Sequence, residues 1–189
     1  MNLTEEEIIR LCKKRNTKAQ KVLYNKYQGV LLGICIRYGK SRAEAEDILQ
    51  LGMLRIFKNI DSYSGKGSFE GWMKRIVVNV AIDNFRKNNK HYYYYDIDEI
   101  NGEPYLATDI PKTLEVEDIL KTIHQLPDGY RMVFNMYAIE GYSHKEIAAK
   151  LGISENTSKT QLLKARKSLR KKLMRLNKLP QQIKVENER

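Results

Sequence analysis

The sequence predicts an all-α protein made of two small helical domains joined by a flexible acidic linker. Apolar residues recur three and four positions apart through most of the chain, and no stretch alternates convincingly as a β-strand does. Residues 89–111 break this periodicity and carry Pro104 and Pro111, which is typical of an extended linker. A helix-turn-helix pattern follows near the C-terminus. The expected division is a domain at 1–90, a linker at 91–111, a domain at 112–178 and a polar tail at 179–189.

Four helices are expected in the first domain, and polar caps or breaks mark their ends. Thr4 precedes three glutamates, which caps the first helix and places acidic side chains at its positive end. The second helix is expected from 17 to about 38, the third from about 42 to 60 after the cap Ser41, and the fourth from about 68 to 88. Val30 is expected on the apolar face of the second helix. Turn-forming residues at 61–68 predict a loop.

The second domain is expected to hold helices from about 113 to 126 and from 130 to 140, followed by the helix-turn-helix at 143–171. Gly152 suits a left-handed cap after the first helix of this motif, and Ser154 is a natural N-cap for the second. The apolar positions expected to close the angle between the two helices are Ile147, Leu151, Ile153, Leu162 and Leu163. A hairpin buried in a larger core is the alternative, but the second helix carries much charge for burial.

The charge of the chain points to a polyanionic partner. The net charge is +11 and the sequence pI is about 9.5. Nine basic and no acidic residues lie between Lys159 and Lys178, whereas eight acidic residues and one basic residue lie between Asp96 and Asp118. Because the apolar residues are committed to a helical core, nucleic acid is favoured over a membrane surface. A solvated basic face without a partner is the alternative, and it leaves the helix-turn-helix pattern unexplained.

No targeting or metal-binding signal is found in the sequence. The N-terminus begins polar and acidic, and no apolar stretch is long enough to cross a bilayer. Cys12 and Cys35 fall at apolar positions of helices and are expected to be reduced core residues. The three scattered histidines offer no ligand spacing for zinc. A cytoplasmic protein without a cofactor is expected.

Four stretches of sequence, taken in their order along the chain, resemble one protein family. They are AEDILQ (45–50), LRIFKNIDSY (54–63), FEGWMKRIVVNVAIDNFRK (69–87) and LPDGYRMVFNMYAIEGYSHKEIAAKLGISENTSKTQLLKARKSL (126–169). The chain resembles an extracytoplasmic-function (group IV) sigma factor of the bacterial sigma-70 family over residues of about 17–90 and 112–173. The resemblance implies a non-enzymatic specificity subunit that binds core RNA polymerase, recognises and melts the minus-ten element, and binds the minus-thirty-five element of promoter DNA.

The resemblance assigns the polymerase contact to the third helix. Its residues would bind the clamp helices of the largest subunit, and the flap of the second-largest subunit is a further contact of the family. The positions matched to this contact are Asp47, Gln50, Leu51 and Leu54. Family members usually carry Glu where this chain has Leu51, which adds apolar contact but removes a carboxylate. A solvated helix face is the alternative.

The resemblance assigns minus-ten recognition to the loop at 61–68 and the helix after it. A melted base recovers stacking and hydrogen bonds on a protein surface, and the loop offers amides, hydroxyls and an aromatic face. The implied minus-ten residues are Tyr63, Ser64, Lys66, Lys74, Arg75, Asn79, Arg86 and Lys87. Asn79 either reads a base edge or is a satisfied polar surface residue. Trp72 is expected to anchor the core rather than to act as a melting wedge.

The resemblance assigns minus-thirty-five binding to the second helix of the helix-turn-helix, whose exposed positions would face base edges or phosphates. The implied residues are Ser154, Glu155, Asn156, Thr157, Ser158, Lys159, Gln161, Lys164, Arg166 and Lys167. Asn156, Ser158 and Gln161 stand where Gly, Val and Arg are frequent in the family. Because Asn and Gln favour adenine and Arg favours guanine, an element that depends less on guanine is expected.

Two other classes of function are weighed against the sigma factor. An autonomous regulator would bind an operator through the same helix-turn-helix, usually as a symmetric dimer. A nucleic-acid enzyme would use Glu44, Glu46 and Asp47 as metal ligands, but no further catalytic group joins them.

The family resemblance also implies an anti-sigma partner. The tyrosine run at 92–95 is expected to pack opportunistically in the linker, with a stray strand or a base-stacking surface as alternatives.

Overall fold

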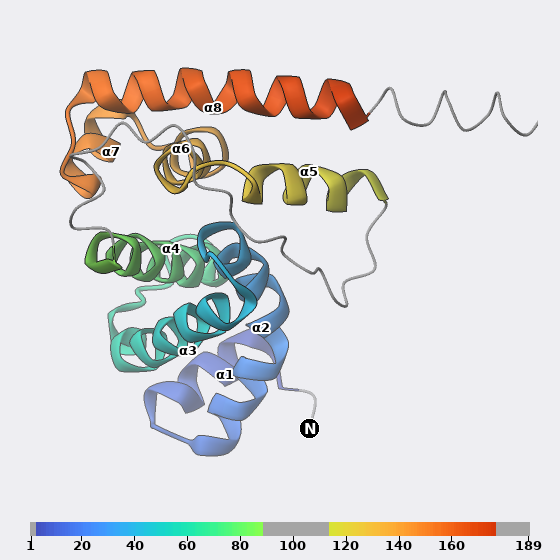
Figure 1. Cartoon of the computed structure of the whole chain (residues 1–189). Coiled ribbons are helices and arrows are strands. Elements are labelled where there is room, and N and C mark those ends of the chain that lie inside the picture. The colour runs from blue at the N-terminus through green and yellow to red at the C-terminus, as the bar shows by residue number, and fades with distance from the viewer. Residues whose placement is uncertain (1–2, 89–113, 177–189) are drawn as a thin grey trace, which may run out of the picture. The chain divides into compact units, whose positions relative to one another are not determined.

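The computed structural model describes residues 3–88 and 114–176, which form helices and short connections without a β-strand in these ranges (Figure 1). The expected all-α class is confirmed. Contacts divide the chain into two compact units, Met1–Asn88 and Asn89–Arg189. No helix among the described residues is both long and apolar enough to cross a membrane. The expected linker at 91–111, with its tyrosine run, and the tail at 179–189 lie outside the described residues.

The first unit is a small bundle whose helices pack side by side (Figure 1). Its elements are α1 (Glu5–Lys13), α2 (Thr17–Tyr38), α3 (Arg42–Asn59), the 3-10 turn η1 (Ile60–Ser62) and α4 (Phe69–Asn88). Helices α2, α3 and α4 pack pairwise, and α1 packs on α2. The fully buried side chains that hold them together include Ile8, Leu23, Leu31, Ile48, Ile56, Met73 and Val77. Burial of this apolar surface is the main force that assembles the unit.

The expected caps of the first unit are confirmed. Thr4 and Glu7 form a reciprocal capping box at the start of α1, and the Ser41 hydroxyl accepts a hydrogen bond from the amide of Glu44 at the start of α3. The Glu44 carboxylate also accepts hydrogen bonds from the Lys40 amide and from the side chain of Asn84. These contacts connect the start of α3 to the C-terminal half of α4.

Gly52 sets how closely α3 approaches α4. It is buried, and a Cβ placed on it would lie 2.9 Å from Cγ2 of Val77. Only the absence of a side chain allows this contact. On the opposite side of α3, Leu51 and Leu54 are exposed to solvent. The close packing at Gly52 therefore fixes the helix that carries the predicted polymerase contact.

The second unit is built around the helix-turn-helix. Its elements are α5 (Leu114–His124), α6 (Asp128–Phe134), the π-helical turn η3 (Asn135–Ile139), α7 (His144–Leu151) and α8 (Glu155–Leu176). One buried cluster consists of Ile123 of α5, Leu126 of the following connection, and Ala165 and Leu169 of α8, and the partly buried Tyr130 and Phe134 of α6 pack against it. Helix α7 packs on α8 through the buried Ile147, Leu151 and Leu162.

The caps of the helix-turn-helix agree with the sequence analysis. Ser143 and Glu146 form a capping box at the start of α7, and Gly152 ends that helix with φ of 73°. The Ser154 hydroxyl accepts a hydrogen bond from the amide of Thr157 at 3.0 Å and so begins α8. These signals end one helix and begin the next within four residues, which makes α7 and α8 cross.

Several expectations about individual residues are wrong. Val30 is 46 % exposed on α2, and Leu163 is 69 % exposed on α8, so neither belongs to the apolar contacts assigned to it. Loop residues 61 and 62 continue as η1. The helix expected at 130–140 begins at Asp128 and widens into a π-helical turn, in which the Glu140 amide donates to the Asn135 carbonyl at 3.0 Å. The amino-acid sequence alone does not show which side of an amphipathic helix the neighbouring helices cover.

Candidate polymerase and promoter interface

The predicted polymerase contact forms one continuous exposed face on α3. Its four residues are Asp47, Gln50, Leu51 and Leu54, and their spacings of three and four positions place them side by side on a helix. All four are exposed, and the exposed fractions of Leu51 and Leu54 are 51 % and 65 %. Asp47 and Gln50 flank this apolar pair with polar groups. Two large aliphatic side chains held in water next to polar ones are typical of a docking face.

The loop between η1 and α4 is built on an aromatic cluster. The Tyr63 ring lies 4.9 Å from Phe69 and 5.6 Å from Trp72, and Phe69 stacks on Trp72 at 5.6 Å between ring centroids. Phe69 is buried, whereas Tyr63 and Trp72 are half-buried. Trp72 was expected to anchor the core; it packs on the buried Phe69 but is itself half-buried at the edge of the core. The cluster holds the base of the loop rigidly against α4.

Glycines and hydrogen bonds give the loop its course. Gly65 and Gly67 have φ of 78° and 86°, values that glycine adopts without strain. The Tyr63 hydroxyl donates to the Gly67 carbonyl at 2.7 Å, which closes the loop on itself. Ser64 and Lys66 project from it and are exposed. The loop thus offers a hydroxyl, an ammonium group and backbone amides on a fixed frame.

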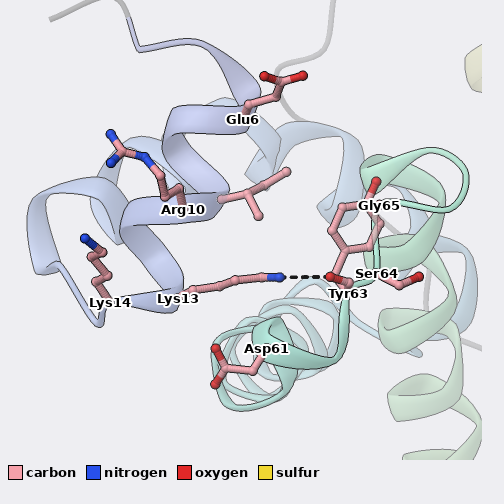
Figure 2. Close-up of a pocket in the computed structure, with 9 residues that line it drawn as sticks. Glu6, Arg10, Lys13, Lys14, Asp61, Tyr63, Ser64 and Gly65 are labelled. Carbon is pink, nitrogen blue, oxygen red and sulfur yellow. Dashed lines mark hydrogen bonds between the residues drawn. The ribbon is translucent and has the colours of Figure 1, made fainter.

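The end of α1 and its connection to α2 hold η1 and the start of the loop from outside. Arg15, with φ of 60°, donates to the Phe57 carbonyl at 2.7 Å and to the Asp61 carboxylate at 2.6 Å. The Lys13 ammonium donates to the Tyr63 carbonyl at 2.9 Å (Figure 2). The sequence analysis missed these three hydrogen bonds, because a basic residue at or just after the end of a helix carries no sign of a partner more than 40 positions away.

The predicted minus-ten residues of α4 differ in their exposure and in their contacts within the protein. Arg75 and Arg86 are exposed and share one face with Asn79, while Lys87 is exposed near the end of the helix. Lys74 forms an ion pair of 2.6 Å with Glu70. Asn79 is half-buried and already has a partner within the protein, so it must exchange that partner to read a base edge.

Helix α8 has a buried face and an opposite face that is exposed. The buried line is Ser158, Leu162, Ala165 and Leu169. The line on the far side, at the spacing of successive helical turns, is Asn156, Thr160, Leu163 and Lys167, all exposed. Lys159 and Arg166 are exposed on one flank, and Lys164 on the other. The sequence analysis missed Thr160 and Leu163, although their spacing from Asn156 was a signal for both.

Ser158 is not available to DNA, and its expected exposure is wrong. Its side chain has no exposed surface, and its hydroxyl lies 2.9 Å from Nδ1 of His144. The His144 ring stacks on Tyr137 at 4.5 Å between centroids. Ser158 therefore connects α8 to the start of α7 instead of facing a base. The small polar residue is compatible with burial because His144 satisfies its hydroxyl.

The start of α8 is partly used for its own capping. Ser154 and Thr157 share a hydrogen bond of 2.9 Å between their hydroxyls. Glu155 and Asn156 are exposed beside them. Gln161 is half-buried, and its carbonyl oxygen is buried without a hydrogen bond to the described residues. It lines a hollow with Tyr130, Asn156, Thr157, Thr160 and Lys164.

Tyrosines of the second unit lie beneath the basic side chains of α8. The Lys164 ammonium lies 5.8 Å from the ring centroid of Tyr130, and the Arg166 guanidinium lies 5.6 Å from that of Tyr137. Such cation–π contacts orient long side chains that would otherwise be mobile. Two of the predicted phosphate contacts are therefore partly positioned before DNA arrives.

The alternative of an enzyme that acts on nucleic acid needs Glu44, Glu46 and Asp47 as metal ligands, and within residues 3–88 and 114–176 no group of three or more such side chains could hold a metal ion. Glu44 is engaged by Lys40 and Asn84, and Glu46 forms an ion pair of 2.6 Å with Arg42. The two buried thiols are poor nucleophiles, because burial raises the pKa of Cys35 to about 12 and also raises that of Cys12.

Comparison with known proteins identifies both units. The family model described as Sigma-70 region 2 matches residues 23–91, and the model described as Sigma-70, region 4 matches residues 117–169. The chain is 32 % identical to the ECF RNA polymerase sigma factor SigW of Bacillus subtilis, an alignment that covers 92 % of this chain and 98 % of SigW. It is 25 % identical to the ECF RNA polymerase sigma-E factor of Escherichia coli K12, over 92 % and 96 % of the two chains.

A solved structure shares the fold. Sigma factor RpoE of Bartonella quintana, determined in complex with the anti-sigma factor NepR, matches with a TM-score of 0.52 at 20 % identity, over 82 % of this chain and 96 % of that one. Two helical units that carry sigma region 2 and region 4 define a transcription initiation factor of the sigma-70 class. The chain belongs to the ECF sigma factors. It is therefore a non-enzymatic alternative sigma factor that binds core RNA polymerase and directs promoter-specific initiation.

Proposed function

We propose that the exposed face of α3 is the surface that docks on the clamp helices of the polymerase largest subunit. The observation that carries this assignment is the pair Leu51 and Leu54, two aliphatic side chains exposed on a helix whose other side is firmly packed. A rigid apolar face loses little conformational entropy on docking. Leu51 takes the place of a carboxylate common in the family, so this chain relies more on apolar contact there.

The loop at 63–68 captures an unpaired base of the minus-ten element. Its tyrosine, hydroxyl and backbone amides surround a frame that Arg15 and the aromatic cluster hold in place. A rigid frame favours a flipped base because the pocket need not be ordered at the time of binding. Arg75, Arg86 and Lys87 contact phosphates along α4, and Asn79 reads a base after it exchanges its internal partner. Phosphate contacts position the strand, and base contacts specify it.

The far face of α8 enters the major groove of the minus-thirty-five element. Asn156 and Gln161 favour adenine, and the exposed Leu163 offers an apolar surface for a thymine methyl group. Lys159, Lys164, Arg166 and Lys167 contact phosphates. The element is therefore less dependent on guanine than those read by arginine. Because Ser158 is buried, it acts through the position of α7 and not through a base.

Further partners are assigned to this protein on the same basis. The second unit also contacts the flap of the second-largest polymerase subunit, and the protein acts in the cytoplasm. An anti-sigma factor holds it inactive, as the Bartonella quintana protein, which shares the fold, forms such a complex. A pull-down from cells that recovers polymerase subunits alone would count against the anti-sigma partner.

The proposed role as a promoter-specific sigma factor is tested by run-off transcription with purified core polymerase on a promoter selected from genomic fragments. Specific transcripts are expected only when the protein is added, and they are lost when the loop at 61–68 is scrambled. Tight duplex binding without core binding or initiation would favour an autonomous regulator.

The α3 assignment has its own matched test. The double variant Leu51→Ala/Leu54→Ala is expected to weaken core binding about tenfold or more, because truncation of a central apolar pair removes hot-spot contacts. Val30→Ala on α2, which truncates another aliphatic side chain exposed to solvent, is the control. Equal core affinity for both variants would refute the assignment.

A further inference from the structure

The exposed face of α4 carries a carboxylate among its basic residues. Arg75, Asn79, Asp83 and Arg86 follow one another at spacings of four, four and three positions, which places them along one face of the helix. Of the Asp83 side chain, 42 % is accessible to solvent. A polyanion that follows this face therefore passes a group of its own sign. Like charges that meet at an interface weaken binding, so the carboxylate has to be neutralised.

The neutralising group comes from the neighbouring helix. The Arg55 guanidinium on α3 donates a hydrogen bond of 2.8 Å to the Asp83 carboxylate. Helices α3 and α4 run side by side, and the ion pair spans the two of them (Figure 1). Arg55 directly follows Leu54, at the edge of the proposed polymerase-docking face. It therefore lies beside one proposed interface and acts on a residue of the other.

Cations on α4 itself would otherwise pair with this carboxylate. Arg86 and Lys87 lie three and four positions after Asp83, which are the spacings at which opposite charges meet on a helix. Such a pair forms at the start of α4, where Glu70 engages the lysine four positions on at 2.6 Å. Within residues 3–88 and 114–176, neither Arg86 nor Lys87 forms an ion pair, and both are exposed. The contact from α3 thus leaves both cations free.

We propose that Arg55 is a positioning residue for the minus-ten strand. It holds the Asp83 carboxylate and so keeps Arg86 and Lys87 available for phosphates. An ion pair that is this exposed contributes little to folding stability, whereas a free carboxylate beside a phosphate path acts directly on DNA binding. This inference rests on the proposed contacts of α4 with the unpaired strand, and it extends the residues that serve those contacts onto α3.

The test compares variants of the full chain assembled with core polymerase. Arg55→Gln frees the Asp83 carboxylate, Arg55→Lys keeps a cation opposite it, and Arg55→Gln/Asp83→Asn removes both charges. Arg42→Gln is the matched control. Arg42 forms a similarly exposed ion pair of 2.6 Å with Glu46 at the start of α3, and its replacement changes the net charge by the same amount.

The measured quantity is the affinity for a single strand. The probe is a short fluorescein-labelled strand with the minus-ten sequence of a promoter selected by run-off transcription. Its binding to each assembled complex is followed by anisotropy across a range of salt concentrations. The affinity of each variant for core polymerase is measured separately. Unchanged emission of Trp72 shows that each variant is folded.

The expected result is a loss that a second substitution restores. Arg55→Gln should lower the affinity about fivefold at low salt, and the slope of log affinity against log salt should fall by about 0.7, the contribution of one phosphate contact to a single strand. Arg55→Gln/Asp83→Asn should return to within about twofold of the unaltered protein, because no free carboxylate remains to capture a cation. Arg55→Lys should keep most of the affinity, and Arg42→Gln should bind as the unaltered protein does.

The outcomes separate this inference from the function it rests on. If the double variant binds no better than Arg55→Gln, the arginine does not act through Asp83 and the inference is wrong. An unchanged affinity for Arg55→Gln, or an equal loss for Arg42→Gln, would also overturn it while initiation by the unaltered protein continued. So would weaker core binding by Arg55→Gln, because the arginine would then serve the polymerase. Failure of the unaltered protein to bind the strand and to initiate would instead refute the proposed function.

Discussion

The packing of α3 on α4 at Gly52 makes a sharp prediction for the variant Gly52→Ala. An added Cβ would lie 2.9 Å from Cγ2 of Val77 and 3.7 Å from its Cα and Cβ atoms. Val77 is fully buried and β-branched, so it cannot rotate away without a new clash. The helices must therefore separate by a few tenths of an ångström. The cost falls on the packing that positions Leu51 and Leu54.

Two opposing terms decide the size of the effect. Replacement of glycine by alanine inside a helix stabilises by about 1 kcal/mol, whereas overpacking of a tight core costs about 1–3 kcal/mol. With a central overpacking cost of about 2 kcal/mol, the net loss in the free energy of unfolding is about 1 kcal/mol. The control Gly29→Ala meets no atom within 4 Å on exposed α2 and is expected to gain about 0.5–1 kcal/mol.

Trp72 provides an assay specific for the first unit. It is the only tryptophan in the chain, and it stacks on the buried Phe69. Urea unfolding followed by tryptophan emission therefore reports on this unit without interference from the second. The two variants are expected to move the unfolding midpoint in opposite directions. Equal stability of Gly52→Ala and Gly29→Ala would show that α4 accommodates the methyl group freely and would refute the packing argument.

Three further predictions concern buried and titrating groups. Ser158→Ala should destabilise the second unit by about 1 kcal/mol through loss of the bond to His144, measured by urea unfolding followed by circular dichroism; an unchanged midpoint would contradict it. Cys35 should resist thiol reagents at pH 8 until the protein unfolds, because its raised pKa keeps it protonated, and rapid native labelling would argue against its burial. Hydrogen bonds from Ser143 lower the pKa of Glu146 in the folded protein. The stability that this carboxylate contributes is therefore present above the pKa of Glu146 in the unfolded chain, and it is lost as the pH falls through the pKa in the folded protein. NMR titration should show a higher pKa of Glu146 in the variant Ser143→Ala.

The local signals of this sequence were sufficient to place the caps of its helices. Thr4, Ser41, Ser143 and Ser154 each cap the helix they were expected to cap, and Gly152 adopts the left-handed conformation expected of it. These outcomes depend on hydrogen bonds between residues three or four positions apart. Interactions of that range are encoded in short segments, so they can be inferred without knowledge of the tertiary structure.

The exposed side of each helix was harder to infer. Leu163 was assigned to the apolar contact and Ser158 to the DNA face, but the structure reverses the two. Leu162 and Leu163 are adjacent in the sequence, so the apolar spacing alone permits either of them to face the core. The position of His144, which accommodates the Ser158 hydroxyl, selects the observed one. Composition alone cannot register a partner that a different helix supplies.

The sequence by itself determined the helical class, the capped starts of α1, α3, α7 and α8, and the membership in the sigma family through motifs that run along the chain. Only the tertiary structure decided which residues of α8 face outward, that Arg15 and Lys13 hold the minus-ten loop, and that Arg55 pairs with Asp83 across two helices. The physical reason is the range of the interactions. Caps and periodicity act within one or two helical turns, whereas the loop and the ion pair depend on contacts between residues 28 to 50 positions apart.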